Sequence, residues 1–444
     1  MAKNLTRRGF LGGAAVAGTS LAAMGMVGCS NQSSDSSEGA DNSSSDKVNL
    51  QFWCHENQVW TASYEAMAKA FEESHPEYHV EVTSYPYDVY NDKIQTALSS
   101  TSGGPDVIAV WGGMAPSFIE TDALSPVPDD LASELSTDYL EPTVGIYKKE
   151  GICYGVPEEF NLEYGGILVN KKLFDEAGLE YPTTWDEMRA ISKQVAVRDG
   201  DINTMSGIEL VDTDALICNY LAMILQQGGT YYDEDGTVNF NTPEGIKAMQ
   251  EMVSTVKDGD NDLRHLSDGD YDYVDVFEDK AYGGAKGPWA IAEGTDSYKL
   301  TYGEDFEYIP MPLYGDKQAF AAETGWGLIV PANGKNVDAA WEYVKFFSAP
   351  ENLIEHNIAC YQLPPRASLL DSDEYKSKMP QMSFILDMLP SGTWFGPYNT
   401  SDFRTIFNNG FIELCESENP DYEGVLTKVS EQITKECKIS YSMD

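Results

Sequence analysis

Aromatic and carboxylate side chains follow the ends of two predicted strands in this chain. Trp53 and Glu56 lie at and just after the end of the strand predicted over residues 48–53, and Trp111 follows the strand predicted over residues 107–110. Ligands of open α/β sheets bind just outside the carboxyl ends of the strands. Aromatic rings stack on flat apolar surfaces and carboxylates accept hydrogen bonds. We therefore expect Trp53, Glu56 and Trp111 to contact a ligand.

The predicted elements around these residues alternate between strand and helix. Residues 48–53 alternate apolar and polar side chains. The helical stretch after them places four apolar residues on one face: Tyr64, Met67, Ala68 and Phe71. An extended segment follows at residues 79–82, and the run at 107–110 is apolar throughout, which is typical of a strand buried on both faces. This alternation predicts an α/β fold with mainly parallel sheets flanked by helices.

The chain is long and strongly acidic. Its 444 residues exceed what one ordinary hydrophobic core organises, so we expect two lobes. Its formal net charge is −43 at pH 7. Because a surface this negative repels polyanions, we expect no nucleic-acid partner, and a phosphorylated ligand would need a local basic pocket.

The sequence contains none of the common motifs for catalysis or cofactor binding. It has no G-x-S-x-G, no H-E-x-x-H, no phosphate-binding loop and no G-x-G-x-x-G after a strand, so we predict no catalytic residue and no cofactor. His55 stands beside Cys54, but neighbouring side chains on a strand diverge. We interpret the acidic stretch 258–279 as a solvated loop. No metal site is therefore predicted.

Six sequence blocks follow one another in a characteristic order. They are FEESHPEYHVEV (71–82), YNDKIQTALSSTSGGPDVIAVW (90–111), YGVPEEFNLEYGGILVNKKLFDEAGLEYPTTWDEM (154–188), YYDEDGTVNFNTPEGIKAM (231–249), GPWAI (287–291) and ETGWGLIVPANGKNVDAAWEYVKFFS (323–348). In this order they resemble the extracellular solute-binding proteins of ABC importers, in particular the large sugar-binding family. The resemblance runs from about residue 50 to residue 355, and residues 356–444 match no motif.

The resemblance implies a two-lobe fold of the periplasmic-binding-protein type, whose lobes close on a ligand by hinge motion. The chain would cross between the lobes near residues 156–159 and again near residues 323–325. The expected division gives the first lobe residues 48–157 plus 322–350, and the second lobe residues 158–321 plus 351–444.

The resemblance also implies a carbohydrate ligand whose rings stack on aromatic side chains. Trp289 in the GPWAI block and Trp326 after the second crossing are candidates for this role. Trp394 and Tyr398 lie in a Gly/Pro-rich segment and are candidates for the rim of the cleft. Core packing is the alternative role of each ring.

Polar candidates for binding the hydroxyl groups lie at the first crossing and in a later loop. They are Glu158, Glu159, Asn161 and Arg366. Because adjacent residues of an extended segment point in opposite directions, we expect only one of Glu158 and Glu159 to face the cleft. Surface or interlobe salt bridges are the alternative role of these residues.

The N-terminus is organised as an export signal. Arg7 and Arg8 precede a short Gly/Ala-rich apolar run that ends at Cys29, which resembles a twin-arginine signal with a lipoprotein processing box. We expect residues 1–28 to be a signal peptide, Cys29 to carry the lipid, and residues 29–46 to form a flexible tether. The alternative is an uncleaved membrane helix, although the run is barely long enough to span a bilayer.

The six cysteines after Cys29 are scattered singly along the chain. An even number in an exported protein permits three disulfides, but a body this large does not need them to fold. Disulfides and buried thiols therefore stay equally open.

Together these features predict a monomeric binding protein on the outer face of the cytoplasmic membrane, anchored through lipidated Cys29. It would capture a carbohydrate, of oligosaccharide size, and pass it to an ABC permease without doing chemistry itself. One alternative is an exported carbohydrate-active enzyme that uses a pair of carboxylates. The other is the same fold binding a cationic solute such as a polyamine, which the acidity would favour.

Overall fold

The computed structural model describes residues 47–100, 104–213, 215–234, 236–266, 272–398, 401–437 and 439. The predicted signal peptide, Cys29 and the tether lie outside these residues. Within the described ranges, no helix combines the length and the apolar character needed to cross a membrane.

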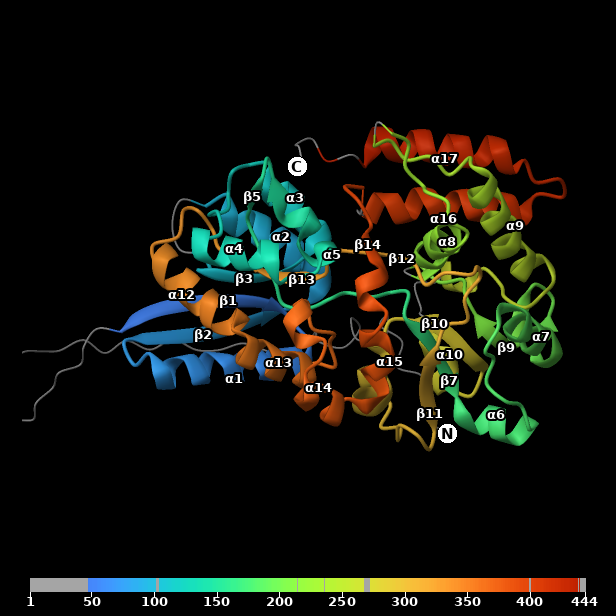
Figure 1. The fold of residues 1–444 in the computed structure, drawn as a ribbon, viewed down its shortest axis with the longest axis horizontal. Coiled ribbons are helices and arrows are strands. Elements are labelled where there is room, and N and C mark those ends of the chain that lie inside the picture. Colours follow the sequence, from blue (N-terminus) through green and yellow to red (C-terminus); the bar gives the residue numbers. More distant parts are fainter. Residues whose placement is uncertain are drawn as a thin grey trace, which may run out of the picture. The chain divides into compact units, whose positions relative to one another are not determined.

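The first sheet has the strand order β2-β1-β3-β13-β6 (Figure 1). Its strands are β1 (Val48–His55), β2 (Tyr78–Tyr85), β3 (Val107–Trp111), β6 (Val156–Pro157) and β13 (Trp326–Ile329). β1 is parallel to β2 and β3, as the strand–helix alternation predicts, whereas β13 is antiparallel to β3 and β6. β13 runs in the opposite direction because the chain returns here from the second sheet.

The second sheet has the strand order β11-β7-β10-β9-β8. Its strands are β7 (Gly166–Asn170), β8 (Val197–Asp199), β9 (Ile202–Glu209), β10 (Ala281–Lys286) and β11 (Phe306–Pro310). Among these neighbours only β9 and β10 are parallel. The sheet is therefore mixed rather than mainly parallel, since a tight turn joins β8 to β9 and such turns connect antiparallel strands.

Helices on the first sheet include α1 (Gln58–Ser74), α12 (Val337–Ser348) and α13 (Pro350–Ala359). The side chain of Asn57 starts α1 by accepting the backbone N–H groups of Val59 and Trp60. The four predicted apolar residues of α1 are buried, which confirms the predicted face. α13 packs against α1 and α12, although we expected residues from 351 onward to accompany the second lobe. Shorter elements on this side are α2 (Tyr87–Leu98), α3 (Ala115–Ile119), α4 (Asp129–Thr137), α5 (Glu141–Val144), β4 (Lys148–Lys149) and β5 (Ile152–Cys153).

Helices of the second side gather around α8 (Ala215–Gln226), which is buried along almost its whole length. α8 contacts α9 (Pro243–Lys257) and α16 (Ser401–Glu416), and α17 (Tyr422–Glu436) lies along α16 and α9 (Figure 1). The motif-free C-terminal region thus covers a helix that is apolar all round. The other elements are α6 (Lys171–Ala177), α7 (Trp185–Val195), α10 (Asp272–Phe277), α11 (Ala290–Ala292), the π-helical turn η5 (Glu293–Ser297), β12 (Phe320–Ala322), α14 (Asp373–Lys378), α15 (Ser383–Leu386) and β14 (Gly392–Trp394).

The chain passes between the two sheets at three places. Residues 158–165 lead from β6 to β7, and residues 323–325 lead from β12 to β13. The third passage runs from α13 through α14 and α15 to α16. Backbone hydrogen bonds tie the passages together, from Glu158 N–H to Trp326 O at 3.1 Å and from Phe160 N–H to Leu363 O at 2.8 Å.

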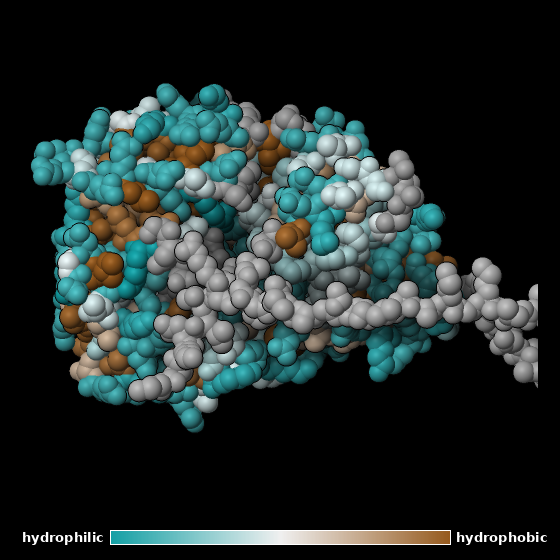
Figure 2. Space-filling model, turned by 180° about the vertical axis from the view of Figure 1, so that it is seen from behind, coloured by the Kyte–Doolittle hydropathy of each residue, from teal (hydrophilic) through white to brown (hydrophobic). Residues whose placement is uncertain are grey.

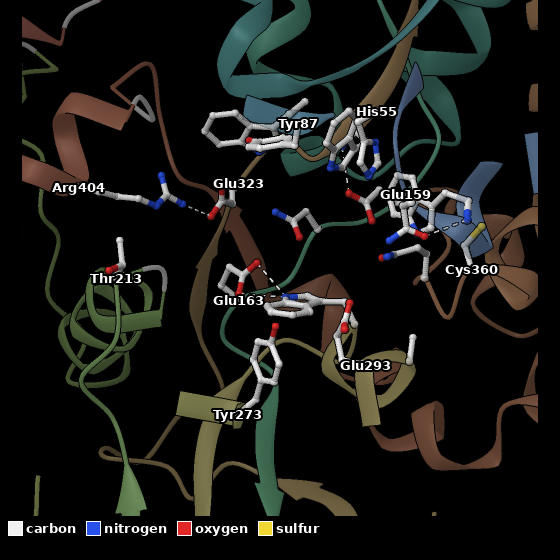
Figure 3. Close-up of a pocket in the computed structure, with 18 of the residues that line it drawn as sticks. His55, Tyr87, Glu159, Glu163, Thr213, Tyr273, Glu293, Glu323, Cys360 and Arg404 are labelled. Atoms are coloured by element: carbon white, nitrogen blue, oxygen red, sulfur yellow. Dashed lines mark hydrogen bonds and ion pairs between the residues drawn. The ribbon is translucent and has the colours of Figure 1, made fainter. Parts of the chain in front are cut away.

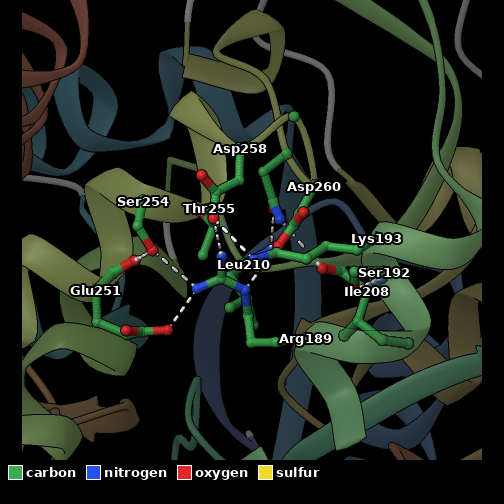
Figure 4. Close-up of polar contacts among 12 residues, drawn as sticks. Arg189, Ser192, Lys193, Ile208, Leu210, Glu251, Ser254, Thr255, Asp258 and Asp260 are labelled. Carbon is green, nitrogen blue, oxygen red and sulfur yellow. Dashed lines mark hydrogen bonds and ion pairs between the residues drawn. The ribbon is translucent and has the colours of Figure 1, made fainter. Parts of the chain in front are cut away.

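A polar cluster around Arg189 joins α7 to the end of α9 (Figure 4). Arg189 Nε donates to Asp260 Oδ2 at 2.6 Å, its Nη2 lies 3.2 Å from Asp258 Oδ2, and its Nη1 pairs closely with Glu251. The Asp260 carboxylate is 1 % exposed. The Arg189 guanidinium takes the place of water around Asp260, because it supplies both a positive charge and hydrogen-bond donors.

The interpretation of the acidic stretch 258–279 as a solvated loop was wrong for several of its residues. Asp260, Asp262 and Asp275 are buried. Arg264 neutralises part of this group, with its Nη2 at 2.6 Å from Asp275 Oδ2. The partners that make burial possible are distant in sequence, so local composition could not reveal them.

No disulfide joins the six cysteines after Cys29, all of which the structure describes. Four of them are buried, namely Cys54, Cys218, Cys360 and Cys437, and act as small apolar residues. On the face drawn in Figure 2, hydrophilic residues dominate the coloured surface and apolar residues are scattered between them.

Candidate functional site

A cavity of about 790 Å³ lies where the passages between the sheets meet the strand ends (Figure 3). It is lined by the ends of β1 and β3, by the first two passages, and by residues of α10, η5 and α16. Its volume falls in the range of ~300–1,000 Å³ typical of small-molecule sites.

The first-sheet side of the cavity is aromatic. Trp326 at the start of β13 stacks on His55 at the end of β1, with ring centroids 4.2 Å apart. Trp60 meets Trp326 edge-on at 5.6 Å, and the half-exposed ring of Tyr87 lies 6.2 Å from it. Burial lowers the pKa of His55 to about 4, so its imidazole is neutral at physiological pH. These four residues offer ring faces and edges without charge.

Glu159 connects the first two passages at the cavity wall. Its Oε1 accepts a hydrogen bond from the Trp326 backbone N–H at 3.0 Å. Burial raises the pKa of Glu159 to about 8. Gly325 permits this approach, because a Cβ there would lie 2.6 Å from Asn161 Cβ and 2.7 Å from Glu159 Oε1. The passages are thus packed too closely at this point for a larger residue at position 325.

The second-sheet side of the cavity carries acidic residues around one tryptophan. Trp289 Nε1 donates to both carboxylate oxygens of Glu163, at 3.1 and 3.2 Å. Tyr273 meets the Trp289 ring edge-on, with centroids 5.5 Å apart. Glu293 and Asp296 line the cavity from η5. Single π-helical turns are rare and are frequent at functional sites.

Arg404 brings a positive charge to the cavity from α16. Its Nη2 forms a close ion pair with Glu323 Oε1 in the second passage. The guanidinium lies 5.8 Å from the ring centre of Trp111. Among the described residues that line the cavity, Arg404 is the single Lys or Arg, whereas five side chains are Asp or Glu.

Five residues predicted from the sequence line this cavity: Trp111, Glu159, Asn161, Trp289 and Trp326. The structure therefore brings together candidates from four separate segments of the chain. Ligand binding by these residues stays a prediction.

Trp53 and Glu56 lie outside the lining because β1 extends to His55, two residues beyond the predicted end. Trp53 packs edge-on against Tyr85 at 4.9 Å. Glu56 is exposed. His55, on the same face of the strand as Trp53, reaches the cavity instead.

Glu158 and Arg366 also lie outside the lining. Glu158 is fully buried, and its Oε1 accepts the Tyr64 hydroxyl at 2.8 Å. Only Glu159 of the adjacent pair faces the cavity, as the alternation of an extended segment predicts. Arg366 is buried and forms ion pairs with Glu134 and Asp138, which is the salt-bridge alternative.

Trp394 and Tyr398 contribute to packing rather than to the lining. Trp394 lies on β14 against Gly145, where an added Cβ would collide with its ring. Tyr398 is buried and donates its hydroxyl to Gly236 O at 3.0 Å. Strand pairing of β14 with β12 holds Trp394 in this position, where it is half-buried.

Sequence reasoning missed several lining residues, among them His55, Tyr87, Glu163, Glu293 and Arg404. Glu163 follows Asn161 by two residues in the same passage, so the period of an extended segment could have indicated it. Arg404 comes from a region without motifs, and only the packing of α16 brings it to the cavity.

One group of side chains among the described residues has the proximity of metal ligands: Glu209, His265 and Asp275. His265 Nε2 lies 3.5 Å from Glu209 Oε2 and 3.4 Å from Asp275 Oδ2. Arg264 Nη2 already contacts both acids, at 2.9 and 2.6 Å. Because a guanidinium neutralises these carboxylates, the group forms a buried ion-pair cluster that holds the end of β9.

Two sheets linked by three passages, with a mixed aromatic and polar cavity at the passages, define a two-lobe ligand-binding protein. The sequence matches the family described as bacterial extracellular solute-binding protein over residues 57–354. The chain belongs to this family.

Two relatives illustrate the family. The arabinooligosaccharide-binding protein of Halalkalibacterium halodurans is 27% identical over 212 residues, which are 47% of this chain and 45% of the relative. This chain thus matches less than half of that protein. The maltotriose-binding protein of Pyrococcus abyssi is 22% identical over 349 residues, which are 75% of this chain and 70% of the relative.

The fold is that of solved two-lobe binding proteins. The cyclic α-maltosyl-1,6-maltose-binding protein of Arthrobacter globiformis has a TM-score of 0.71 at 18% identity, covering 88% of this chain and 98% of that one. The GacH receptor of Streptomyces glaucescens has a TM-score of 0.69 at 21% identity, covering 88% and 100%.

Proposed function

We propose that this protein captures a carbohydrate of oligosaccharide size in the cavity and delivers it to the permease of an ABC importer. The observation that carries the proposal is the cavity, which sets the rings of Trp326 and Trp289 beside acidic and amide side chains at the passages. Sugar rings stack on such aromatic faces, and their hydroxyls donate to carboxylates. The relatives named for arabinooligosaccharide and maltotriose support a saccharide ligand.

In this proposal, the three passages between the two sheets form the hinge about which the lobes close. A ligand that contacts both sides of the cavity binds the closed conformation more tightly than the open one. Binding therefore shifts the equilibrium between the two conformations toward the closed one. The protein acts as a monomer without cofactor or catalysis, and the lipid on Cys29 keeps it at the outer face of the cytoplasmic membrane beside the permease.

A thermal-shift screen of the full-length protein against neutral, aminated and acidic saccharides tests the proposal, followed by calorimetry of each hit. A bound saccharide should raise the melting temperature with its concentration, and small-angle scattering should show compaction. Released cleavage products would favour the exported carbohydrate-active enzyme, and the absence of any saccharide ligand would overturn the proposal. Labelling with a lipid precursor tests the anchor, because the Cys29→Ala variant should not take up the label.

A further inference from the structure

The cavity is chemically asymmetric. On the first-sheet side, Trp326, His55 and Tyr87 present neutral rings. On the second-sheet side, Glu163 and Glu293 lie opposite them (Figure 3). Its one lining arginine, Arg404, is engaged by Glu323, so the lining as described has an excess of negative charge.

This excess is unfavourable for a neutral ligand. When the lobes close on a saccharide, water leaves the acidic side chains, and hydroxyl groups replace only the hydrogen bonds. Taking charge out of water is costly unless an opposite charge takes its place. A ligand with a positive group would compensate for the charge, and an ammonium is also attracted to aromatic faces.

The two acids of η5, Glu293 and Asp296, both line the cavity. The Glu293 carboxylate accepts the Ser297 hydroxyl at 2.8 Å, and Asp296 is exposed at the cavity. A cation bound in the cavity beside η5 would lie close to both negative charges.

We propose that the natural ligand is a saccharide that carries a protonated amine, an amino sugar or an oligomer of one. Its ring stacks against Trp326, and its ammonium group binds beside Glu293, Asp296 and Glu163. This inference rests on the proposed function and narrows it to one class of saccharide. It also gives the acidic residues of the cavity a role in binding a sugar, although acidity alone would equally favour a polyamine.

Matched ligands that differ in one substituent test the inference. Hexoses, their 2-amino-2-deoxy counterparts and the N-acetylated forms are compared by calorimetry at about pH 6, where the amine is protonated. The three forms are used as monosaccharides and as β-1,4-linked oligomers of equal length, with the full-length protein. We expect the amine form to bind about tenfold more tightly than the hydroxyl and acetamide forms. Added salt should reduce this preference.

Charge-neutralising variants test which side chains cause the preference for the amine form of the sugar. The double variant Glu293→Gln, Asp296→Asn should lose most of the preference for the amine while binding the neutral sugar at least as tightly as before. Glu176→Gln removes an exposed charge of α6 outside the cavity and should keep the preference. A double variant that still prefers the amine by the same factor would overturn the placement of the ammonium group.

Three outcomes separate this inference from the function on which it rests. A neutral sugar that binds as tightly as its amine form overturns the inference and leaves the proposed function standing. Binding of no saccharide overturns both. Spermidine binding as tightly as any amino sugar overturns the requirement for a sugar ring.

Discussion

The two sides of the cavity place their side chains by different means. On the first-sheet side, rings stand at the ends of strands, as with His55 on β1 and Trp326 on β13. On the second-sheet side, the acids Glu163, Glu293 and Asp296 stand in a passage and on η5. The comparison teaches that the rings are placed by the strands of the sheet, whereas the negative charges are placed by a connecting segment and a short helical turn.

Breaking the ion pairs of the second-sheet side should give the largest effect. Arg189→Met leaves the buried Asp260 carboxylate without its guanidinium, and removing one partner of a buried ion pair costs about 3–5 kcal/mol. We expect the free energy of unfolding in urea to fall by this amount. Lys193→Met is the matched control, because Lys193 pairs with Asp258 at the surface, and its loss should cost about 0.5 kcal/mol or less. Equal losses in the two variants would contradict the role given to the buried cluster.

Removing the central ring of the first-sheet side should weaken binding without a comparable loss of stability. Trp326→Ala deletes the ring that contacts His55, Trp60 and Tyr87, and we expect the Kd for any saccharide ligand to rise about a hundredfold. Calorimetry measures this change, and far-ultraviolet circular dichroism checks that the variant is folded. Trp53→Phe serves as control, since Trp53 packs outside the cavity on the same sheet. Unchanged affinity in Trp326→Ala would mean that the aromatic side does not bind the ligand.

The first-sheet side was the more predictable one, since its signals are local. A buried strand at 107–110, an amphipathic helix with Tyr64 and Phe71, and the alternation at 158–159 follow from periodicity alone. The sequence pattern predicts the end of the first strand at Trp53, two residues before its actual end at His55, because the alternation alone does not mark where the strand stops.

The second-sheet side was harder to predict because its signals are distant in sequence. Burial of Asp260 depends on Arg189, 71 residues earlier, and the charge at Glu323 depends on Arg404, 81 residues later. Local composition therefore predicts a solvated loop around Asp260, and it gives no sign of the pairing between Glu323 and Arg404. Long-range pairing of this kind leaves no periodic pattern in the chain.

The buried acids of the two sides differ in what opposes the rise that burial gives their pKa, although on the second-sheet side the pKa of Asp260 is still raised. Burial raises the pKa of Glu158 to about 8, and the hydrogen bond from Tyr64 opposes the rise only in part. For Asp275, burial acts in the same direction, but the hydrogen bond from His265 and the charge of Arg264 outweigh it, so the pKa is lowered. The first-sheet side should therefore contribute a loss of stability at alkaline pH.

That contribution has a defined pH window. Glu158 and Glu159 hold extra protons in the folded state between their ordinary pKa of 4.5 and about 8, so their contribution is complete below this window and is lost as pH rises through it. Burial lowers the pKa of His55 to about 4 and of His356 to about 3, so their contribution is present above 6.5 and is lost below it. The two effects oppose each other between 4.5 and 6.5.

The two acids dominate between pH 6.5 and 8, where we expect the free energy of unfolding to fall by about 2–3 kcal/mol. Urea titrations at the two pH values measure this slope. Glu158→Gln should reduce the slope by about half, since the amide still accepts the Tyr64 hydroxyl and cannot ionise, whereas Glu159 still ionises. Glu56→Gln, at an exposed site, should leave the slope as in the wild type. A Glu158→Gln protein with the full wild-type slope would remove Glu158 as its source.

The smallest expected effect separates the start of α7 from the ion pairs that this helix carries. Thr184 Oγ1 accepts the Glu187 N–H at 3.2 Å, and Glu187 Oε2 accepts the Thr184 N–H at 3.1 Å, which together form a capping box. Thr184→Ala should lower the free energy of unfolding by about 1 kcal/mol and leave ligand affinity unchanged. If Thr184→Ala costs as much as Arg189→Met, the helix start rather than the guanidinium holds the second-sheet side together. If the two losses simply add in the double variant, the cap and the cluster stabilise α7 independently.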